Sequence, residues 1–397
     1  MEAIRGWTPV QKRTVAAAYL GWTLDAFDYF LLVFVIKDVA AQYAVSITTI
    51  AFATTLTLAM RPVGAFIFGR LADRYGRRPV LMINIGVYSL LSFATAFAPS
   101  VTGLLVIRAL FGVGMGGVWG VGSSLAMETI KKEARGAVSG LLQSGYSAGY
   151  LLAAIVYGLL FPLVGWRGMF MVGIVPAIIL IPFILVAVPE SPRFTIAEKK
   201  PSTFQVLGQH WKLAIYAILL MTAFNFFSHG TQDIYPTFLQ RQHNLPPSMV
   251  SSITILGNIG AILGCFLFGP LSQRFGRRRI MITSALLSIL VIYLWAFSST
   301  VTLLILGAFL MQFFNQGAWS VIPAHLNELS PRAARGTFPG TVYQLGNLFA
   351  SLNLPLQTSI AEQQHSYRIA MAAVAFCAAA AISLLVAFGP EAHNAEM

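Results

Sequence analysis

The chain has 397 residues, of which 57% are hydrophobic and only 10% are charged. A soluble domain carries about 25% charged residues, so this composition excludes a soluble fold and indicates a protein that crosses a membrane many times. The net charge of +12 does not indicate nucleic-acid binding, because the basic residues lie in short segments between apolar runs, a pattern that sets membrane orientation.

Apolar segments of spanning length follow one another along the chain. They predict an all-α membrane protein with twelve transmembrane helices, many of them antiparallel neighbours joined by short links. The predicted spans are 14–36, 47–69, 79–98, 101–127, 136–161, 168–188, 212–239, 247–269, 279–298, 301–325, 335–358 and 367–388. Cys265 and Cys377 both lie in apolar runs, and we expect them to fill the core rather than form a disulfide or bind metal.

The two halves of the chain repeat each other at an offset of 200 residues. Residues 69–78 (GRLADRYGRR) recur as residues 269–278 (GPLSQRFGRR), and Asp25 falls opposite Asn225. Such repeats are typical of transporters whose binding site lies between two related bundles near the middle of the bilayer. We predict an N-terminal six-helix bundle over 1–189, a cytoplasmic linker over 190–211 and a C-terminal six-helix bundle over 212–397.

Lysine and arginine are distributed unevenly across the predicted membrane. The N-terminus and the loops on its side hold 20 of the 26 Lys and Arg residues, and the opposite side holds 4. Basic residues are enriched in cytoplasmic loops. The sequence therefore predicts a multi-pass protein of the plasma (inner) membrane with both termini in the cytoplasm.

The first predicted span carries two carboxylates, Asp25 and Asp28, about 17 Å into the membrane, near its midplane. Burial at this depth favours the neutral form of an unpaired carboxylate, so either residue is a candidate proton carrier. Arg61 in the second span lies at a similar depth, and its planar guanidinium suits bidentate binding of a substrate carboxylate. An Asp25–Arg61 pair that opens as substrate arrives would couple proton to anion; the alternative is a static ion pair.

Residues 69–78 form the basic loop between the second and third spans. This loop resembles the signature G-x-x-x-D-R-x-G-R-R of the major facilitator superfamily. Gly69 is expected to allow close helix approach, and Gly76 is expected to permit the turn. Asp73 is expected to form an ion pair, or to contact a helix N-terminus, across the seam between the halves. We predict a conformational latch formed by Gly69, Asp73, Arg74, Gly76 and Arg77. The alternative is a basic loop that only sets topology, and Gln273 in the second copy argues against a symmetric latch.

Arg108 in the fourth span precedes glycines at 112, 114 and 116. This arrangement resembles the R-x-x-x-G-x-G pattern of proton-driven members of the same superfamily. The resemblance implies a direct role for Arg108 in proton coupling, while tight helix packing explains the glycines equally well.

The seventh predicted span contains residues 225–237 (NFFSHGTQDIYPT), an unusually polar stretch for a membrane segment. On a helix its polar residues fall in one stripe about 140° wide. A polar stripe in an apolar bundle lines a cavity, whereas the alternative is a seam that only joins helices. The residues of this stripe are Asn225, Ser228, His229, Gln232 and Asp233.

Each of these side chains has a plausible chemical role. His229 can titrate near neutral pH or donate to a carboxylate. Asp233 can orient His229 or carry the proton itself, and its alternative is a solvated helix cap. Asn225 and Gln232 can donate hydrogen bonds to carboxylate or hydroxyl oxygens.

The same stretch resembles the signature N-x-x-[ST]-H-x-[ST]-Q-D-x-x-x-T of the fungal lactate/proton symporters and their bacterial relatives within the major facilitator superfamily. The resemblance implies two pseudo-symmetric six-helix bundles and a secondary active transporter that imports lactate or a similar small monocarboxylate with a proton by alternating access. The Asp25/Asp28 pair resembles the D-x-[FY]-D of the aromatic-acid and sialic-acid proton symporters, so a symporter of either acid is the alternative.

Further polar residues on the fifth and eleventh spans, among them Tyr146, Gln344 and Asn347, are candidate cavity liners. The predicted substrate-binding set is Arg61, Tyr146, Asn225, His229, Gln232, Gln344 and Asn347. The predicted proton-coupling set is Asp25, Asp28, Arg108, His229 and Asp233.

The chain contains no phosphate-binding loop, no nucleophile elbow and no histidines at zinc-ligand spacing, so we expect neither ATP-driven transport nor enzymatic activity. The expected partners are a small carboxylate anion, H⁺ and the lipid bilayer, with no cofactor, metal or nucleic acid, and the expected functional unit is a monomer. An alternative of another class is a membrane sensor that binds without transport. Such sensors usually carry long soluble tails, and 9 residues follow the last predicted span.

Overall fold

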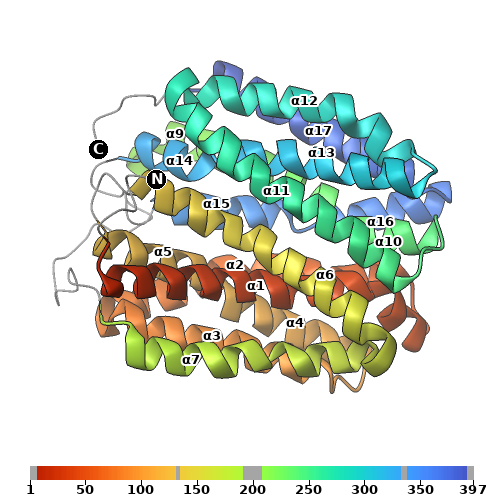
Figure 1. Ribbon diagram of the computed structural model, residues 1–397, viewed down its shortest axis with the longest axis horizontal. Coiled ribbons are helices and arrows are strands. Elements are labelled where there is room, and N and C mark those ends of the chain that lie inside the picture. The colour runs from red at the N-terminus through yellow and green to blue at the C-terminus, as the bar shows by residue number, and fades with distance from the viewer. Residues whose placement is uncertain (1–6, 131–134, 191–207, 332–337, 391–397) are drawn as a thin grey trace.

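The computed structural model describes residues 7–130, 135–190, 208–331 and 338–390, and every regular element in these ranges is an α-helix (Figure 1). The helices run along the long axis of the molecule and pack side by side. Their bounds are α1 (Pro9–Gln42), α2 (Ile47–Tyr75), α3 (Arg77–Thr95), α4 (Val101–Gly116), α5 (Val118–Thr129), α6 (Arg135–Gly173), α7 (Val175–Ala187), α9 (Trp211–Gln232), α10 (Tyr235–Arg241), α11 (Pro247–Phe275), α12 (Arg277–Phe297), α13 (Val301–Trp319), α14 (Ile322–Leu329), α15 (Phe338–Ala350), α16 (Asn353–Gln364) and α17 (Tyr367–Phe388).

Within the described ranges, ten helices are long and apolar enough to cross a membrane. One of them, Gly140–Ala187, joins two predicted spans through a kink at Gly165, where φ is 62°. The eleventh predicted span is absent from the ten because it is divided into α15 and α16. Counting the joined helix as two and the divided one as a single crossing gives the twelve predicted transmembrane segments.

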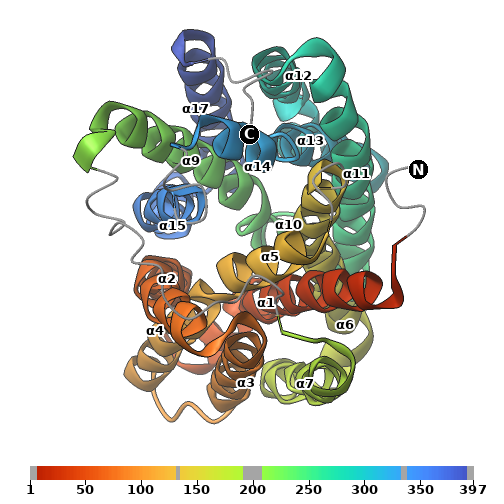
Figure 2. The ribbon, with the colours of Figure 1, turned by 90° about the vertical axis from the view of Figure 1, so that its left-hand side faces the viewer.

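The two halves repeat each other in three dimensions as they do in sequence. α2 and α11 each have 29 residues and begin 200 positions apart, and each ends before a glycine with positive φ, 100° at Gly76 and 94° at Gly276. Seen from the end of the bundle at which α1 begins, most of α1–α7 lies in the lower part of the view and α9–α17 in the upper part (Figure 2). The predicted fold of two pseudo-symmetric six-helix bundles is confirmed.

Helix α1 runs through the interior of the molecule. Every residue from 21 to 36 is buried. Large apolar side chains on other helices face outward instead, with Leu163 79%, Val186 86% and Leu290 77% exposed, as expected for a surface that meets lipid. Any polar group in the middle of α1 therefore faces protein or an internal cavity.

The position of Cys377 differs from our expectation. Cys265 is buried, as predicted for a core residue, but Cys377 is exposed. Cys377 lies on α17 at the edge of the bundle (Figure 2), next to Phe376, which is also exposed. Cys377 therefore lies on the apolar outer surface and does not fill the core.

Glycines determine how closely α2 and α4 approach. A methyl group at Gly112 would overlap the backbone carbonyl of Thr57, and one at Gly116 would overlap the carbonyl of Arg61. The glycines of the fourth span therefore do serve tight packing. Gly69 does not, because a methyl group there would meet no atom within 4 Å. The predicted close helix approach at Gly69 is wrong.

Gly76 forms the turn between α2 and α3, as predicted, with a φ of 100° that side chains disfavour. The Glu190 carboxylate accepts hydrogen bonds from the backbone N–H groups of Arg77, at 2.8 Å, and Arg78, at 3.2 Å, and so places a negative charge at the start of α3. Arg74 is exposed. The side chain of Asp73 lies outside the described residues, so the predicted latch across the seam stays a prediction.

The two halves meet closely at the end of the bundle opposite the start of α1. Gln240 at the end of α10 donates hydrogen bonds to the Phe34 carbonyl, at 3.0 Å, and to the Tyr157 hydroxyl, at 2.9 Å. The Glu362 carboxylate on α16 accepts from the Thr48 backbone N–H at 3.3 Å and from its hydroxyl at 2.9 Å. We call these contacts of Gln240 and Glu362 the outer seam; they close this end of the bundle.

Candidate functional site

Asp25 on α1 and Arg61 on α2 form a buried ion pair in the N-terminal half. Arg61 Nη2 lies 2.6 Å from Asp25 Oδ2, and both side chains are at most 1% exposed. The guanidinium also lies over the ring of Trp22, 5.6 Å from its centroid. Asp25 Oδ1 and Arg61 Nε make no hydrogen bond to any described residue. The pair therefore retains a free acceptor on Asp25 and a free donor on Arg61.

Asp28 and Arg108 form a second, looser pair of opposite charges. Asp28 accepts a hydrogen bond from Ser92 on α3 at 2.9 Å, whereas Asp25 faces α2. Arg108 is an electrostatic neighbour of Asp28, and its guanidinium lies 3.9 Å from the ring centroid of Phe111 without a hydrogen bond to any described residue. Asp25 and Asp28 thus interact with different cations.

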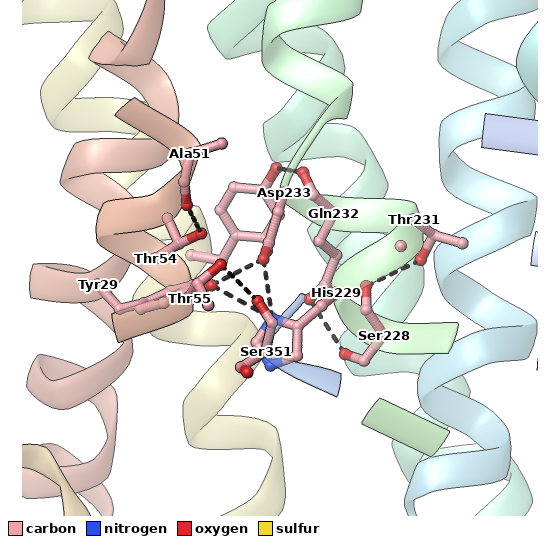
Figure 3. Close-up of polar contacts among 12 residues, drawn as sticks. Tyr29, Ala51, Thr54, Thr55, Ser228, His229, Thr231, Gln232, Asp233 and Ser351 are labelled. Carbon is pink, nitrogen blue, oxygen red and sulfur yellow. Dashed lines mark hydrogen bonds and ion pairs between the residues drawn. The ribbon is translucent and has the colours of Figure 1, made fainter. Parts of the chain in front are cut away.

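His229 and Asp233 lie where α9 meets the N-terminal half. Tyr29 on α1 donates a hydrogen bond of 2.7 Å to Asp233 Oδ2, and its hydroxyl lies 3.4 Å from His229 Nδ1 (Figure 3). His229 Nδ1 is itself 3.0 Å from the same Asp233 oxygen. All three side chains are buried, so Asp233 is not a solvated cap.

The predicted polar stripe of the seventh span divides into two faces. Ser228 accepts from Gln316 on α13, and Gln232 donates to Gln312 on the same helix at 2.9 Å, so this face joins helices inside the C-terminal half. His229 and Asp233 face Tyr29 instead (Figure 3). The alternative of a seam that joins helices therefore holds for Ser228 and Gln232, whereas cavity lining by the stripe stays a prediction.

The remaining predicted liners are also buried. Asn225 donates to the Met221 carbonyl of its own helix at 2.8 Å. Asn347 donates to Gln344 at 3.2 Å, and Gln344 reaches across to the Gly116 carbonyl at 3.5 Å. The Tyr146 hydroxyl has no hydrogen bond to a described residue, and its ring packs 5.6 Å from that of Trp22.

A narrow pocket, which we call the cavity, lies between the halves, toward the end at which α1 begins. Aromatic and apolar side chains dominate its wall, and Gln143 contributes a side-chain amide. Tyr343 connects the cavity to the ion pair. Tyr343 forms part of the cavity wall, and its phenol is close enough to Arg61 to interact with it electrostatically. The lining residues are Trp119, Gln143, Met221, Trp319, Ile322, Pro323, Leu326, Pro339 and Tyr343.

The structure assembles these groups into one chemical arrangement. A guanidinium with a spare donor, a carboxylate with a spare acceptor and an imidazole–carboxylate pair all lie within buried helices near the seam. Buried charges of this kind are costly unless they are paired, so any change of protonation alters which partners they hold. Arg61 can therefore exchange the carboxylate of Asp25 for the carboxylate of a bound molecule.

Sequence reasoning did not select Tyr29, which contacts both His229 and Asp233. Its spacing carried a signal, because Tyr29 is four residues after Asp25 and so lies on the same helical face. Trp119 was also not selected. It lies four residues before Ser123 on α5, and nothing in its spacing distinguishes it from a packing residue.

Comparisons with known proteins place the chain in a family. The sequence pattern of the Major Facilitator Superfamily matches residues 18–239 and 218–396. The chain is 29% identical over 385 residues to the carboxylic acid transporter protein homolog of Saccharomyces cerevisiae, covering 90% of this chain and 62% of the yeast protein's length. It is 25% identical over 385 residues to the sialic acid transporter NanX of Escherichia coli, covering 96% and 94% of the two chains.

A solved structure agrees with this assignment at the level of the fold. The crystal structure of a bacterial homolog of the human lysosomal transporter Spinster, in an inward-facing and unoccupied conformation, matches with a TM-score of 0.71 at 18% identity and covers 96% of this chain and 97% of that one. The chain therefore belongs to the Major Facilitator Superfamily and is a membrane transporter rather than an enzyme.

Proposed function

We propose that this transporter imports a small organic acid together with a proton, and that lactate or a similar monocarboxylate is its substrate. The Asp25–Arg61 pair is the observation that carries the proposal, because a buried guanidinium with an unused Nε–H is a ready partner for a second carboxylate. The names of the yeast and Escherichia coli relatives support the acid class. The match of residues 225–237 to the lactate/proton symporter signature supports lactate in particular.

Proton and anion binding are linked through this pair. Protonation of Asp25 removes the negative charge that holds Arg61, and leaving a buried guanidinium unpaired costs about 3–5 kcal/mol. A substrate carboxylate relieves that cost by taking the place of Asp25. The loaded site then has the same net charge as the empty one, so it can cross between the two access states without burying an extra charge.

The C-terminal half supplies the second set of proposed contacts. His229, Gln344 and Asn347 are buried near the seam, and Asn347 Oδ1 has no hydrogen bond to a described residue. These donors and acceptors suit the hydroxyl and second oxygen of a hydroxy acid. Proton exchange at His229 and Asp233 would complete the site.

The proposed orientation follows from the Lys and Arg distribution. The start of α1 and the end of α17 lie at the same end of the bundle (Figure 1), on the side that carries 20 of the 26 basic residues. We propose that this end faces the cytoplasm in the plasma (inner) membrane and that the monomer is the functional unit. The outer seam is then extracellular.

The wall of the cavity favours a second candidate substrate. Trp119, Trp319 and Tyr343 present three aromatic rings, and the cavity contains no charged residue among its described lining. An acid with a flat apolar body would fill such a wall better than lactate does. An aromatic-acid symporter is therefore the second candidate, while the sialic-acid alternative rests only on the resemblance of the Asp25/Asp28 pair.

Uptake into proteoliposomes tests the proposal. Labelled lactate should accumulate against its gradient when the outside is acidic, and a panel of lactate, benzoate and sialic acid as unlabelled competitors ranks the two candidates. A sensor would bind the acid without accumulating it. No acid-stimulated uptake of any of these acids above that of empty liposomes would exclude the proposed function.

A further inference from the structure

We infer that the Tyr29–Asp233 hydrogen bond is a proton-sensitive tie that couples the charge of Asp233 to closure of the outer seam. The inference rests on the proposed proton symport and assigns to Tyr29 a positioning role within it. Tyr29 belongs to the N-terminal half and Asp233 to the C-terminal half, so their bond joins the two bodies that must move apart.

The geometry brings a hydroxyl donor and an imidazole nitrogen to one oxygen. Asp233 Oδ2 accepts from the Tyr29 hydroxyl at 2.7 Å and lies 3.0 Å from His229 Nδ1, while Asp233 Oδ1 has no hydrogen bond to a described residue (Figure 3). Oδ1 is therefore where a proton can be added without displacing a donor. Hydrogen bonds to an ionised carboxylate are roughly twice as strong as those to a neutral acid, so a proton on Oδ1 weakens both bonds on Oδ2.

Asp233 also lies at a break in the seventh transmembrane segment. α9 ends at Gln232 and α10 begins at Tyr235, so Asp233 is the cap residue between two separate helices. α10 carries Gln240, which closes the outer seam by donating to the Phe34 carbonyl and the Tyr157 hydroxyl. A short helix attached at this break can change its angle without unwinding α9.

Proton binding at Asp233 and closure of the outer seam therefore oppose each other. Closure brings the Tyr29 hydroxyl onto the carboxylate and favours its ionised form, so closure expels the proton toward the inside. External acid favours the opposite change, in which the tie weakens and the outer seam opens. This is the order of events that an importing proton symporter needs.

Few other titratable or charged groups surround Asp233 within the described residues. His229 lies four residues before it on α9, Tyr29 faces it from α1, and Tyr146 and Tyr150 on α6 interact with it electrostatically. Arg61 on α2 is in turn an electrostatic neighbour of Tyr29. His229 is the ionisable group whose ring nitrogen lies on the same Asp233 oxygen, and the experiment below separates the two.

Tyr150 provides a matched control. It is a second buried tyrosine of the N-terminal half, and its hydroxyl donates across the seam to the backbone carbonyl of Gln232 at 3.0 Å, one residue before Asp233. A backbone carbonyl does not titrate. Tyr150→Phe therefore removes a seam hydrogen bond of similar length but no proton-sensitive one.

The experiment measures the width of the outer seam by electron spin distance measurements. Spin labels are placed at Ala41→Cys at the end of α1 and Ser248→Cys at the start of α11, both exposed, after Cys265 and Cys377 have been replaced by Ala. Distances are recorded at mildly acidic and mildly alkaline pH without substrate, in the otherwise unchanged protein and in Tyr29→Phe, Tyr150→Phe and Asp233→Asn.

We expect the distance distribution of the unchanged protein to shift toward longer values in acid, and Tyr150→Phe to retain this shift. Tyr29→Phe should lose most of it, and Asp233→Asn should show the acid distribution at both pH values. The inference is overturned if Tyr29→Phe keeps the full shift, if Tyr150→Phe loses as much, or if Asp233→Asn still responds, which would assign the response to His229. If Tyr29→Phe does not fold, Asp233→Asn alone decides. Because no substrate is used, a negative uptake experiment leaves this result unaffected.

Discussion

At the scale of single residues, the central feature is a guanidinium that is buried but not fully used. Arg61 holds Asp25 through Nη2, stacks on Trp22 and leaves Nε without a hydrogen bond to a described residue. Lysine cannot reproduce this geometry, because it offers a compact charge in place of a planar fork. The identity of this residue, and not only its charge, should therefore matter for anion binding.

The first prediction concerns this fork. Arg61→Lys should weaken substrate binding roughly tenfold or more, because a charge-assisted hydrogen bond is worth about 1.5–3 kcal/mol and tenfold in affinity is about 1.4 kcal/mol. Titration calorimetry of the purified protein with the transported acid measures this. Arg277→Lys is the control, since Arg277 makes a two-pronged ion pair with Glu328, at 2.9 and 3.2 Å, outside the proposed site. An unchanged affinity in Arg61→Lys would remove the carboxylate-clamp role.

At the scale of secondary-structure elements, the repeated turn between paired helices shows what the glycines contribute. Gly76 and Gly276 both have positive φ, but only Gly76 lies against another group, the carboxylate of Glu190. Gly69 lies inside α2 and has neither constraint. The three glycines therefore separate backbone strain, steric contact and helix propensity.

The second prediction ranks these three positions by thermal unfolding in detergent. Gly276→Ala should destabilise by about 1–3 kcal/mol through its positive-φ backbone alone. Gly76→Ala should cost more, because its methyl group would also displace Glu190 from the start of α3. Gly69→Ala should stabilise by up to about 1 kcal/mol, since alanine is the better helix former. A Gly76→Ala protein no less stable than Gly276→Ala would contradict the capping role of Glu190.

At the scale of the whole molecule, the buried charges must balance in every conformation through which the transporter passes between its two access states. α1 places Asp25 and Asp28 in the interior, α2 and α4 bring Arg61 and Arg108 to them, and α9 brings His229 and Asp233 to the seam. Because an unpaired charge is costly there, proton and anion are expected to enter together.

The third prediction follows from this balance. Asp25→Asn leaves Arg61 without its carboxylate, so the variant should still bind and exchange substrate but should no longer accumulate it in response to a pH gradient. Counterflow and gradient-driven uptake in proteoliposomes separate these two activities. Asp38→Asn, a half-buried carboxylate nearer the outer end of the same helix, is the control and should keep both. Uphill accumulation by Asp25→Asn would show that another group carries the required proton.

The division of the chain at 190–211 stays a prediction, because residues 191–207 lie outside the described part. The latch around Asp73 stays one for the same reason. The predicted repeat at an offset of 200 residues is confirmed. The equal lengths of α2 and α11 and the similar φ values of Gly76 and Gly276 show it directly.

The sequence alone determined the class of the protein, the positions of its twelve crossings and the kinship of its halves, because these depend on the length, hydrophobicity and repetition of local segments. It also identified Asp25 and Arg61, because ionised groups at mid-membrane depth are rare and costly. It did not determine which partner each polar residue of the seventh span takes.

Only the tertiary structure decided that Ser228 and Gln232 join α13 while His229 and Asp233 face Tyr29 across the seam. These partners lie about 80 to 200 positions apart in the chain. A helical wheel gives the direction of a side chain but not the neighbour that occupies that direction. Helix packing brings such distant residues together, and for this reason the proton-sensitive tie could be found only in the folded molecule.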